Sequence, residues 1–396
     1  MSWKAISLAH DKLSQNAIEF CQKLIQTPSY PGKERNCAEL ILSKMGGLRF
    51  DKTEIDKAGN VLGFVKGTVP NSPKILLATH IDHVGFEDQE MWQFPPFEAI
   101  ISGRKIFGRG AAEAKSAISA QIYGVAAILE AGFRPTNDIH LAFCVQEETG
   151  GTGMRYFVNK EENKIDLAIF GNATSNNIYL GHRGVANIEL IFKGQSAHAS
   201  NPNSGKNPHF PAAKFLTLLE NEMPNFSEHY LLGKTIASPT LYEIGKTNIN
   251  DIPSEVKINL NWRFSSETKE EILEIINKLT KQINFEINVQ ICKQKNITYN
   301  GFDEGTQEHF STSFLTSSDL NFVQSSAKAI EQISGKKQNF GIWKSATDAR
   351  FVAEKGIPTF GFGPGHESLV HQKDEFVEIE MLIEAMKCYS KFIYKN

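Results

Sequence analysis

Short apolar runs alternate with helical patterns in the first half of the chain. Residues 60–65, 75–79 and 139–145 are predicted strands, and the run 75–79 is almost wholly apolar, which is typical of a central strand buried on both faces. Residues 113–131 repeat apolar positions three and four apart and stop before Gly132, which predicts a long helix with a glycine cap. Strands and helices in succession favour an α/β fold with a largely parallel, helix-covered sheet.

A different pattern begins after residue 184. Residues 185–192 and 256–264 alternate between apolar and polar side chains, as half-exposed strands do. Helical patterns at residues 212–219 and 269–282 lie beside them in the sequence. We therefore predict a smaller α+β domain whose sheet is covered by helices on one face.

The last quarter of the chain returns to the first pattern. Residues 319–333 and 379–391 are predicted helices, and residues 357–363 are a predicted strand. The polar stretch 301–318 carries no periodicity that predicts an element.

These patterns divide the chain into a discontinuous main domain, residues 1–184 and 296–396, and an inserted domain, residues 185–295. The length agrees with this division, because 396 residues exceed what a single core usually supports.

Composition narrows the class of partner and the compartment. The 42 basic and 45 acidic residues give a formal net charge of −3, which lacks the basic footprint of a nucleic-acid binder and favours a small-molecule partner. The five cysteines are dispersed without C-x-x-C spacing, so they indicate neither disulfides nor a thiolate zinc site. Charges run through the first twenty residues, unlike a signal peptide, and no stretch offers the about 20 apolar residues of a membrane span. We expect a cytoplasmic protein that does not interact with membranes.

His80 and Asp82 directly follow the predicted strand 75–79. The carboxyl end of a strand is where open α/β sheets build their sites, and residues i and i+2 of an extended segment point to the same side. A carboxylate can hold one imidazole N–H while the other nitrogen binds a metal. A solvated or capping pair is nevertheless the commoner explanation of an isolated His-x-Asp.

Glu147 and Glu148 follow the predicted strand 139–145 and precede the glycine-rich turn 149–153. Adjacent carboxylates repel unless a cation or a proton separates them. A metal that takes one carboxylate and leaves the other as general base resolves the conflict. The alternative is two solvated glutamates in a turn, which the preceding buried strand and the glycine-rich turn make less favourable.

Glu113, His371 and His198 are the remaining polar candidates. Each has a simpler explanation, because an acid favours a helix N-terminus and a single histidine in a loop is usually a surface residue. Taken with the two preceding pairs, they form a set of nitrogen and oxygen ligands without thiolates, which suits zinc, manganese or cobalt in a hydrolase.

Nine motifs follow one another in an order that resembles a known family. They are THIDHV at 79–84, WQFPPF at 92–97, GRG at 108–110, Lys115, QEET at 146–149, GHRG at 181–184, HA at 198–199, TDAR at 347–350, and GPG at 363–365 followed by His371. They resemble the metallopeptidase family of acetylornithine deacetylase, succinyl-diaminopimelate desuccinylase, aminoacylase and carboxypeptidase G. The resemblance covers essentially the whole chain and implies a zinc-exopeptidase-like catalytic domain with an inserted lid domain that forms a homodimer.

The resemblance also implies two metal ions and their ligands. Carried over by position, His80 and Asn172 would bind the first ion, Glu148 and His371 would bind the second, and Glu113 would bridge both.

Catalytic and substrate-binding roles follow from the same resemblance. Glu147 would be the general base that takes a proton from the attacking water and gives it to the leaving amine. Asp82 would support the ligand histidine, and His198 would reach across the dimer to the oxyanion. Arg263 would meet a substrate carboxylate, and Asn250 resembles the family's lid asparagine.

Two positions depart from the family pattern. Glu113 stands where Asp is usual, and Asn172 stands where Glu or Asp is usual. Two divalent ions bring four positive charges, and Glu113, Glu148 and a hydroxide leave that total one charge short. A neutral amide is also a weaker ligand, and the longer Glu113 must bridge ions only ~3.5 to 4 Å apart. We predict weakened occupancy of the His80/Asn172 site and a better supported site at Glu113, Glu148 and His371.

The leading hypothesis is a metal-dependent amidohydrolase that cleaves an N-acyl amino acid or a small peptide with a free carboxylate. Its cofactor would be zinc, with cobalt or manganese as alternatives, at one or two ions per chain. The second hypothesis is a degenerate family member that binds or regulates, since Glu113 and Asn172 replace usual ligands. Retention of Glu147 favours the enzyme. A third hypothesis keeps a metal as Lewis acid for another acyl transfer or a lyase step.

Overall fold

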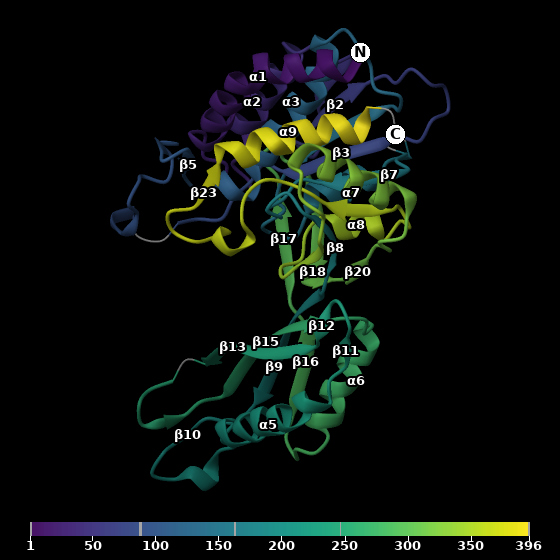
Figure 1. The fold of residues 1–396 in the computed structure, drawn as a ribbon. Coiled ribbons are helices and arrows are strands. Elements are labelled where there is room, and N and C mark those ends of the chain that lie inside the picture. Colours follow the sequence, from purple (N-terminus) through teal and green to yellow (C-terminus); the bar gives the residue numbers. More distant parts are fainter. Residues whose placement is uncertain (1, 87–88, 162–163, 246, 395–396) are drawn as a thin grey trace.

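The computed structural model describes residues 2–86, 89–161, 164–245 and 247–394. It has two lobes, and a mixed sheet of nine strands forms the centre of the larger one (Figure 1). The strand order is β1-β2-β6-β3-β7-β22-β8-β20, with β21 paired to β8. Strands β6, β3, β7 and β22 run parallel, and β1, β2 and β20 add antiparallel pairs toward the edges. The strands are β1 (Lys52–Ile55), β2 (Val61–Val65), β3 (Ile75–His80), β6 (Ile139–Cys144), β7 (Leu167–Phe170), β8 (Ile178–His182), β20 (Phe314–Leu315), β21 (Phe340–Trp343) and β22 (Thr359–Gly361).

The central strand β3 is buried on both faces because helices cover both sides of the sheet. Ile75 and Leu77 belong to the core on one side, and Leu76 and Ala78 belong to the core on the other. The first core is covered by α1 (Ser2–Ile25), α2 (Arg35–Gly46), α3 (Ser116–Glu130), α7 (Asn321–Ser334) and α9 (Ile379–Ile393), and the second by α4 (Thr152–Val158) and α8 (Ala349–Ala353).

Helix α3 lies in the middle of the helical layer, and its many small residues explain how it fits there. Its small residues allow close packing, and a Cβ at Gly124 would lie only 2.9 Å from the carbonyl oxygen of Met386 in α9. Among the residues that the structure describes, no helix combines the length and the apolar character needed to cross a membrane.

The smaller lobe contains an antiparallel sheet of five strands, in the order β13-β15-β9-β16 with β19 paired to β9. In β15, Val256, Ile258, Leu260, Trp262 and Phe264 are all buried, because α5 (His209–Glu222) and α6 (Lys269–Thr280) cover that face. Its alternate residues are half-buried. The strands are β9 (Gly184–Lys193), β13 (Ile236–Ile244), β15 (Glu255–Phe264), β16 (Ile287–Ile291) and β19 (Phe310–Ser311).

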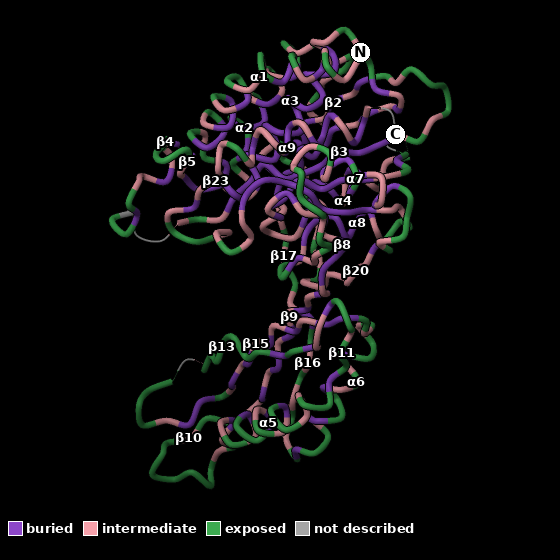
Figure 2. Tube along the Cα trace, viewed as in Figure 1, coloured by how far each residue is buried: buried purple, intermediate pink, exposed green. Residues whose placement is uncertain are grey.

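Short ladders complete the two lobes. They are β4 (Ile101–Ser102) and β5 (Lys105–Phe107) with β23 (Phe376–Glu378), β10 (Ala197–His198) with β14 (Asp251–Ile252), β11 (Glu228–His229) with β12 (Gly233–Lys234), and β17 (Lys293–Ile297) with β18 (Asp303–Glu308). Strand β17 lies where the lobes meet, whereas β10 lies at the far end of the smaller lobe (Figure 1). Buried residues are concentrated in the large sheet, and the segments around β10 are exposed (Figure 2).

The predicted α/β class is confirmed, and the six strands that were predicted lie within one or two residues of observed strands, whereas strands such as β7, β8, β13 and β16 were not predicted. The helix predicted over 113–131 is wrong at its start, because Glu113 and Ala114 have non-helical backbone angles and α3 begins at Ser116. The strand predicted over 357–363 is limited to Thr359–Gly361. The unassigned stretch 301–318 forms β18, β19 and β20, and β19 pairs with the smaller sheet. The division into independent domains stays a prediction.

Candidate functional site

The carboxyl ends of three neighbouring parallel strands deliver polar side chains to one edge of the large sheet. Strand β3 ends at His80, β6 leads into Glu147 and Glu148, and β7 leads into Asn172. Strand β3 pairs with both β6 and β7, so these side chains emerge side by side. The pairing of these three strands therefore determines which residues meet there.

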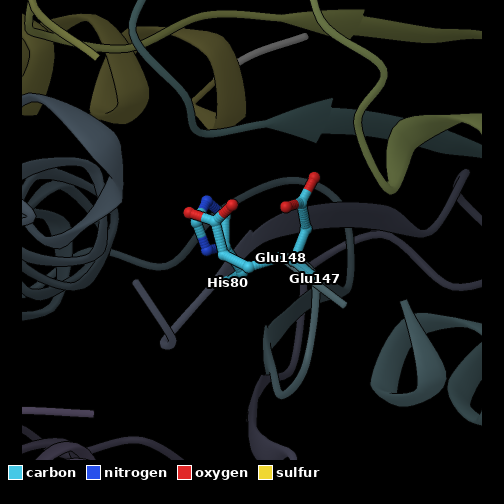
Figure 3. Close-up of side chains that lie close together, drawn as sticks. All are labelled: His80, Glu147 and Glu148. Atoms are coloured by element: carbon cyan, nitrogen blue, oxygen red, sulfur yellow. The ribbon is translucent and has the colours of Figure 1, made fainter. Parts of the chain in front are cut away.

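His80, Glu147 and Glu148 each place a ligand atom within 4.8 Å of the others. Figure 3 shows the imidazole and the two carboxylates grouped together. The His80 side chain is buried, and its Nε2 has no hydrogen-bond partner among the described residues. A buried and unpartnered imidazole nitrogen needs a ligand or a proton acceptor, since leaving it unsatisfied costs free energy.

Asp82 holds this group in place. Its backbone oxygen lies 3.0 Å from His80 Nδ1, and its carboxylate Oδ1 lies 3.5 Å from the same nitrogen. The carboxylate also accepts the backbone N–H groups of Glu147 and Glu148 at 3.1 and 3.0 Å. Asp82 therefore fixes the imidazole so that Nε2 is turned into the site, and it fixes the turn that carries both glutamates.

Glu113, Glu148 and His371 form a second group within 4.8 Å. His371 Nε2 lies 3.1 Å from Glu113 Oε2 and 3.1 Å from Glu148 Oε1. Hydrogen bonding to Glu113 and then to Glu148 raises the pKa of His371 to about 10. Two carboxylates converge here on one nitrogen, which is an arrangement that a divalent cation can occupy in place of the proton.

Glu147, like its neighbour Glu148, is half-buried. Burial raises its pKa well above the ordinary value, and the carboxylates of Asp348, Glu148 and Glu113 raise it further, although His80 opposes them. A carboxyl group in this setting can accept a proton and hold it near neutral pH, as a general base requires.

The chain segment at Glu113 is positioned by a residue that the sequence reasoning missed. Glu375 is buried and accepts the backbone N–H groups of Gly110, Ala112 and Glu113, while Arg109 Nη1 donates to it at 2.7 Å. Its position four residues after His371, paired with the GRG motif, is the only signal that could have indicated it.

Asp348 is a second missed residue. Its side chain is 4% exposed, and it lines a small pocket together with His80, Glu147 and Asn172. Burial raises its pKa to about 6. Asp348 belongs to the TDAR motif at 347–350, and the resemblance assigned no role to this acid.

Asn172 reaches the site, but its amide oxygen is turned away from it. Oδ1 accepts the backbone N–H of Ala173 at 2.6 Å, and Nδ2 donates to Glu113 Oε1 at 2.9 Å. The residue predicted to complete a metal site therefore presents a hydrogen-bond donor to the neighbouring carboxylate.

A cavity of about 370 Å³ lies between the two groups of ligands and the smaller lobe. Its lining includes Glu113, Glu147, Glu148 and His371 from the larger lobe and Arg263 from β15 of the smaller lobe. Arg263 Nε donates to Asn261 Oδ1 at 2.8 Å, which steadies the guanidinium on the polar face of the strand. The structure thus brings Arg263 to the same cavity as the proposed metal ligands.

His198 and Asn250 lie elsewhere. His198 is exposed in β10 at the far end of the smaller lobe (Figure 1), and its Nδ1 lies 2.8 Å from Ser200 Oγ. The backbone oxygen of Asn250 accepts the N–H of Ala199 at 2.7 Å, so the two predicted residues are close to each other. Within one chain they do not join the ligand groups or the cavity lining described above.

Comparison with known proteins relates the chain to metal-dependent hydrolases. Residues 76–395 match the model of peptidase family M20/M25/M40. The chain is 26% identical over 394 residues to succinyl-diaminopimelate desuccinylase of Hydrogenovibrio crunogenus, covering 94% of this chain and 96% of that one. It is 27% identical over 337 residues to an uncharacterized metallohydrolase of Methanocaldococcus jannaschii, covering 80% of each. The fold resembles that of aminopeptidase PepT from Bacillus cereus, with a TM-score of 0.75 and 18% identity over 96% of this chain and 98% of that one.

Proposed function

Because the chain belongs to peptidase family M20/M25/M40, whose members hydrolyse amide bonds, we propose that it cleaves an N-acyl amino acid or a small peptide with a free carboxylate, using Glu147 as general base. One observation carries the proposal. Glu147 is half-buried beside a set of candidate metal-ligand side chains, and it lines the same cavity as Arg263.

The donor set supports a divalent cation as cofactor. Glu113, Glu148 and His371 supply two carboxylates and an imidazole, and His80 adds a buried nitrogen without a partner among the described residues. Zinc is the cation that we propose, and cobalt and manganese accept the same ligands. A bound divalent cation lowers the pKa of water and polarises the carbonyl that is attacked.

The remaining chemistry falls to side chains of the chain. Glu147 takes a proton from water and returns it to the leaving nitrogen, and its raised pKa lets it hold that proton between the two steps. Asp82 keeps Glu147 and His80 in register through its three contacts with them and with Glu148. The carboxylate of the substrate binds Arg263, whose planar guanidinium suits a carboxylate.

We also propose a homodimer formed through the smaller lobe. Strand β13 is at the edge of its sheet, and Leu241, Tyr242 and Ile244 on it are 56, 46 and 51% exposed. Phe210 on α5 is 75% exposed. An apolar edge strand with unpaired backbone groups is suited to a second copy of the chain. In such a dimer His198 and Asn250 complete the partner's site.

Composition supports a proposal for the cellular compartment and for the class of substrate. We propose a cytoplasmic location, supported by five cysteines that are all unpaired, four of them buried. The near balance of charges supports a small molecule, and not a nucleic acid, as the substrate.

A substrate screen tests the proposed function. Purified enzyme is assayed on N-acetyl and N-succinyl amino acids and on dipeptides, each compared with the same compound carrying a carboxamide in place of the free carboxylate. We expect hydrolysis of the free acids, loss of activity with a chelator, and recovery on addition of zinc. Absence of metal-dependent hydrolysis across the panel contradicts the proposal and favours a binding protein, and products other than an acid and an amine favour a different acyl-transfer or lyase reaction.

A further inference from the structure

We propose that this centre holds a single divalent ion, on Glu113, Glu148 and His371, because Asn172 prevents Glu113 from bridging to a second ion at His80. The inference rests on the proposed metal-dependent function, but it concerns only how many ions the chain holds and where.

The amide of Asn172 is fixed at both ends. Oδ1 accepts the backbone N–H of Ala173 at 2.6 Å, and Nδ2 donates to Glu113 Oε1 at 2.9 Å. Turning the amide over would set Oδ1 against the Glu113 carboxylate and Nδ2 against the Ala173 N–H. Both contacts would then be repulsive in a residue that is only 5% exposed. Asn172 therefore presents an N–H group, which cannot ligate a cation.

The same hydrogen bond determines how Glu113 can act. Its Oε1 is engaged by Asn172, and its Oε2 lies 3.1 Å from His371. A bridging carboxylate needs one oxygen for each ion. Here one oxygen faces the His371 side and the other faces a hydrogen-bond donor, so Glu113 serves one ion as a terminal ligand.

Because Glu113 and Asn172 are not available as ligands there, too few ligands remain beside His80 to hold a second ion. The carboxylates grouped with His80 are Glu147 and Glu148, and Asp348, which lines the adjoining pocket, is outside that group. An ion at this position would have to take Glu147, the proposed base, and share Glu148 with the other ion. Charge leads to the same conclusion, since two divalent ions bring four positive charges, and Glu113 and Glu148, the carboxylates left when Glu147 serves as the base, supply two negative ones.

Metal counting tests the inference without an activity assay. The full-length protein is stripped with a chelator, reloaded with excess zinc, separated from loose metal by gel filtration, and analysed by mass spectrometry of the metal. We expect one zinc ion per chain in the wild type and two in Asn172→Asp, where a carboxylate replaces the amide donor. Asn177→Asp is the matched control, since it adds the same charge five residues away, where Asn177 Nδ2 bonds only carbonyl oxygens of its own loop. It should stay at one ion.

Two histidine variants locate the ion. His371→Ala should lose the single ion of the wild type, and His80→Ala should keep it. In the Asn172→Asp background, His80→Ala should reduce the count from two to one. If Asn172→Asp does not fold, the wild-type count and the two single histidine variants still decide the question.

Several results would overturn the inference. They are two tightly held ions or none in the wild type, an ion that is lost with His80→Ala and kept with His371→Ala, or a folded Asn172→Asp that stays at one ion. One ion without hydrolysis of any substrate leaves the inference standing and rejects the proposed function. Hydrolysis by a wild type that holds two ions supports the proposed function and rejects the inference of a single ion.

Discussion

The two lobes contribute to the proposed active site in different ways. The side chains of the larger lobe are held by hydrogen bonds to residues far along the chain, as Asp82 is to the backbone N–H groups of Glu147 and Glu148. Those of the smaller lobe are held locally. Arg263 bonds Asn261 two residues away, and His198 bonds Ser200 two residues away at an exposed position.

This contrast shows which part of the site is complete within one chain. The ligand groups and the base need nothing beyond the larger lobe, because three neighbouring strand ends and the Glu375 contacts place them. Arg263 reaches the cavity from across the junction of the lobes, and His198 does not reach it within the same chain. In the proposed function, the larger lobe would provide the chemistry, and the smaller lobe would provide substrate recognition and contacts with a partner.

The first and largest expected effect comes from removing the proposed base from the larger lobe. Glu147→Gln keeps the size of the side chain but cannot accept the proton, so kcat should fall by ~10² to 10⁴-fold. The measurement is steady-state hydrolysis of the best substrate from the screen. Glu274→Gln, an exposed glutamate on α6 of the smaller lobe, is the control and should leave kcat unchanged.

The zinc content of Glu147→Gln should equal that of the wild type, because Glu147 is not among the proposed ligands. Full activity in Glu147→Gln would assign the base to another residue, and Asp348, buried in the neighbouring pocket, would be the next to test.

The second prediction concerns His198 and asks whether the smaller lobe acts in the partner's site. Loss of one oxyanion donor lowers kcat by ~10² to 10³-fold, so the kcat of His198→Ala should be lower than that of the wild type by this factor. Mixing His198→Ala subunits with Glu147→Gln subunits should then restore activity. In a mixed dimer, one site combines Glu147 of one chain with His198 of the other.

Recovery should reach at most about a quarter of wild-type activity, because random pairing makes half of the dimers mixed and each mixed dimer holds one complete site. The measurement is activity after subunit exchange, with each variant exchanged against itself as the control. If His198 acted within its own chain, the mixture would stay inactive. A strict monomer in light scattering would exclude the role altogether.

The sequence predicted the fold well because its periodicities come from burial that each element experiences directly. Strand β3 is apolar throughout since it is covered on both faces, and β15 alternates since it is covered on one. The strand ends also placed His80, Glu147 and Glu148 correctly at one edge of a sheet, because parallel pairing brings those ends together.

The details of the site depend on contacts that no local pattern reveals. Glu113 was predicted at a helix start, but the contacts of Glu375 hold its backbone in a non-helical turn. Asn172 was expected to offer an oxygen, and its direction is decided by the N–H of Ala173 and by Glu113. These are choices between hydrogen-bond partners in the folded chain, so spacing along the sequence does not determine them.

The third and smallest prediction separates substrate recognition from chemistry. A hydrogen-bonded charge is worth about 1.5 to 3 kcal/mol, so Arg263→Ala should raise KM for a substrate with a free carboxylate by ~10 to 100-fold. The value of kcat should change little, since Arg263 belongs to the smaller lobe and is proposed to bind the carboxylate of the substrate, not the reacting group. Lys257→Ala is the matched control, because Lys257 lies on the same face of β15 six residues away and pairs with Glu255 at 3.8 Å. The carboxamide analogue of the substrate should be as poor for Arg263→Ala as for the wild type. If Arg263→Ala lowered kcat equally for both compounds, the arginine would act on the reacting group, and the division between a catalytic larger lobe and a recognising smaller lobe would fail.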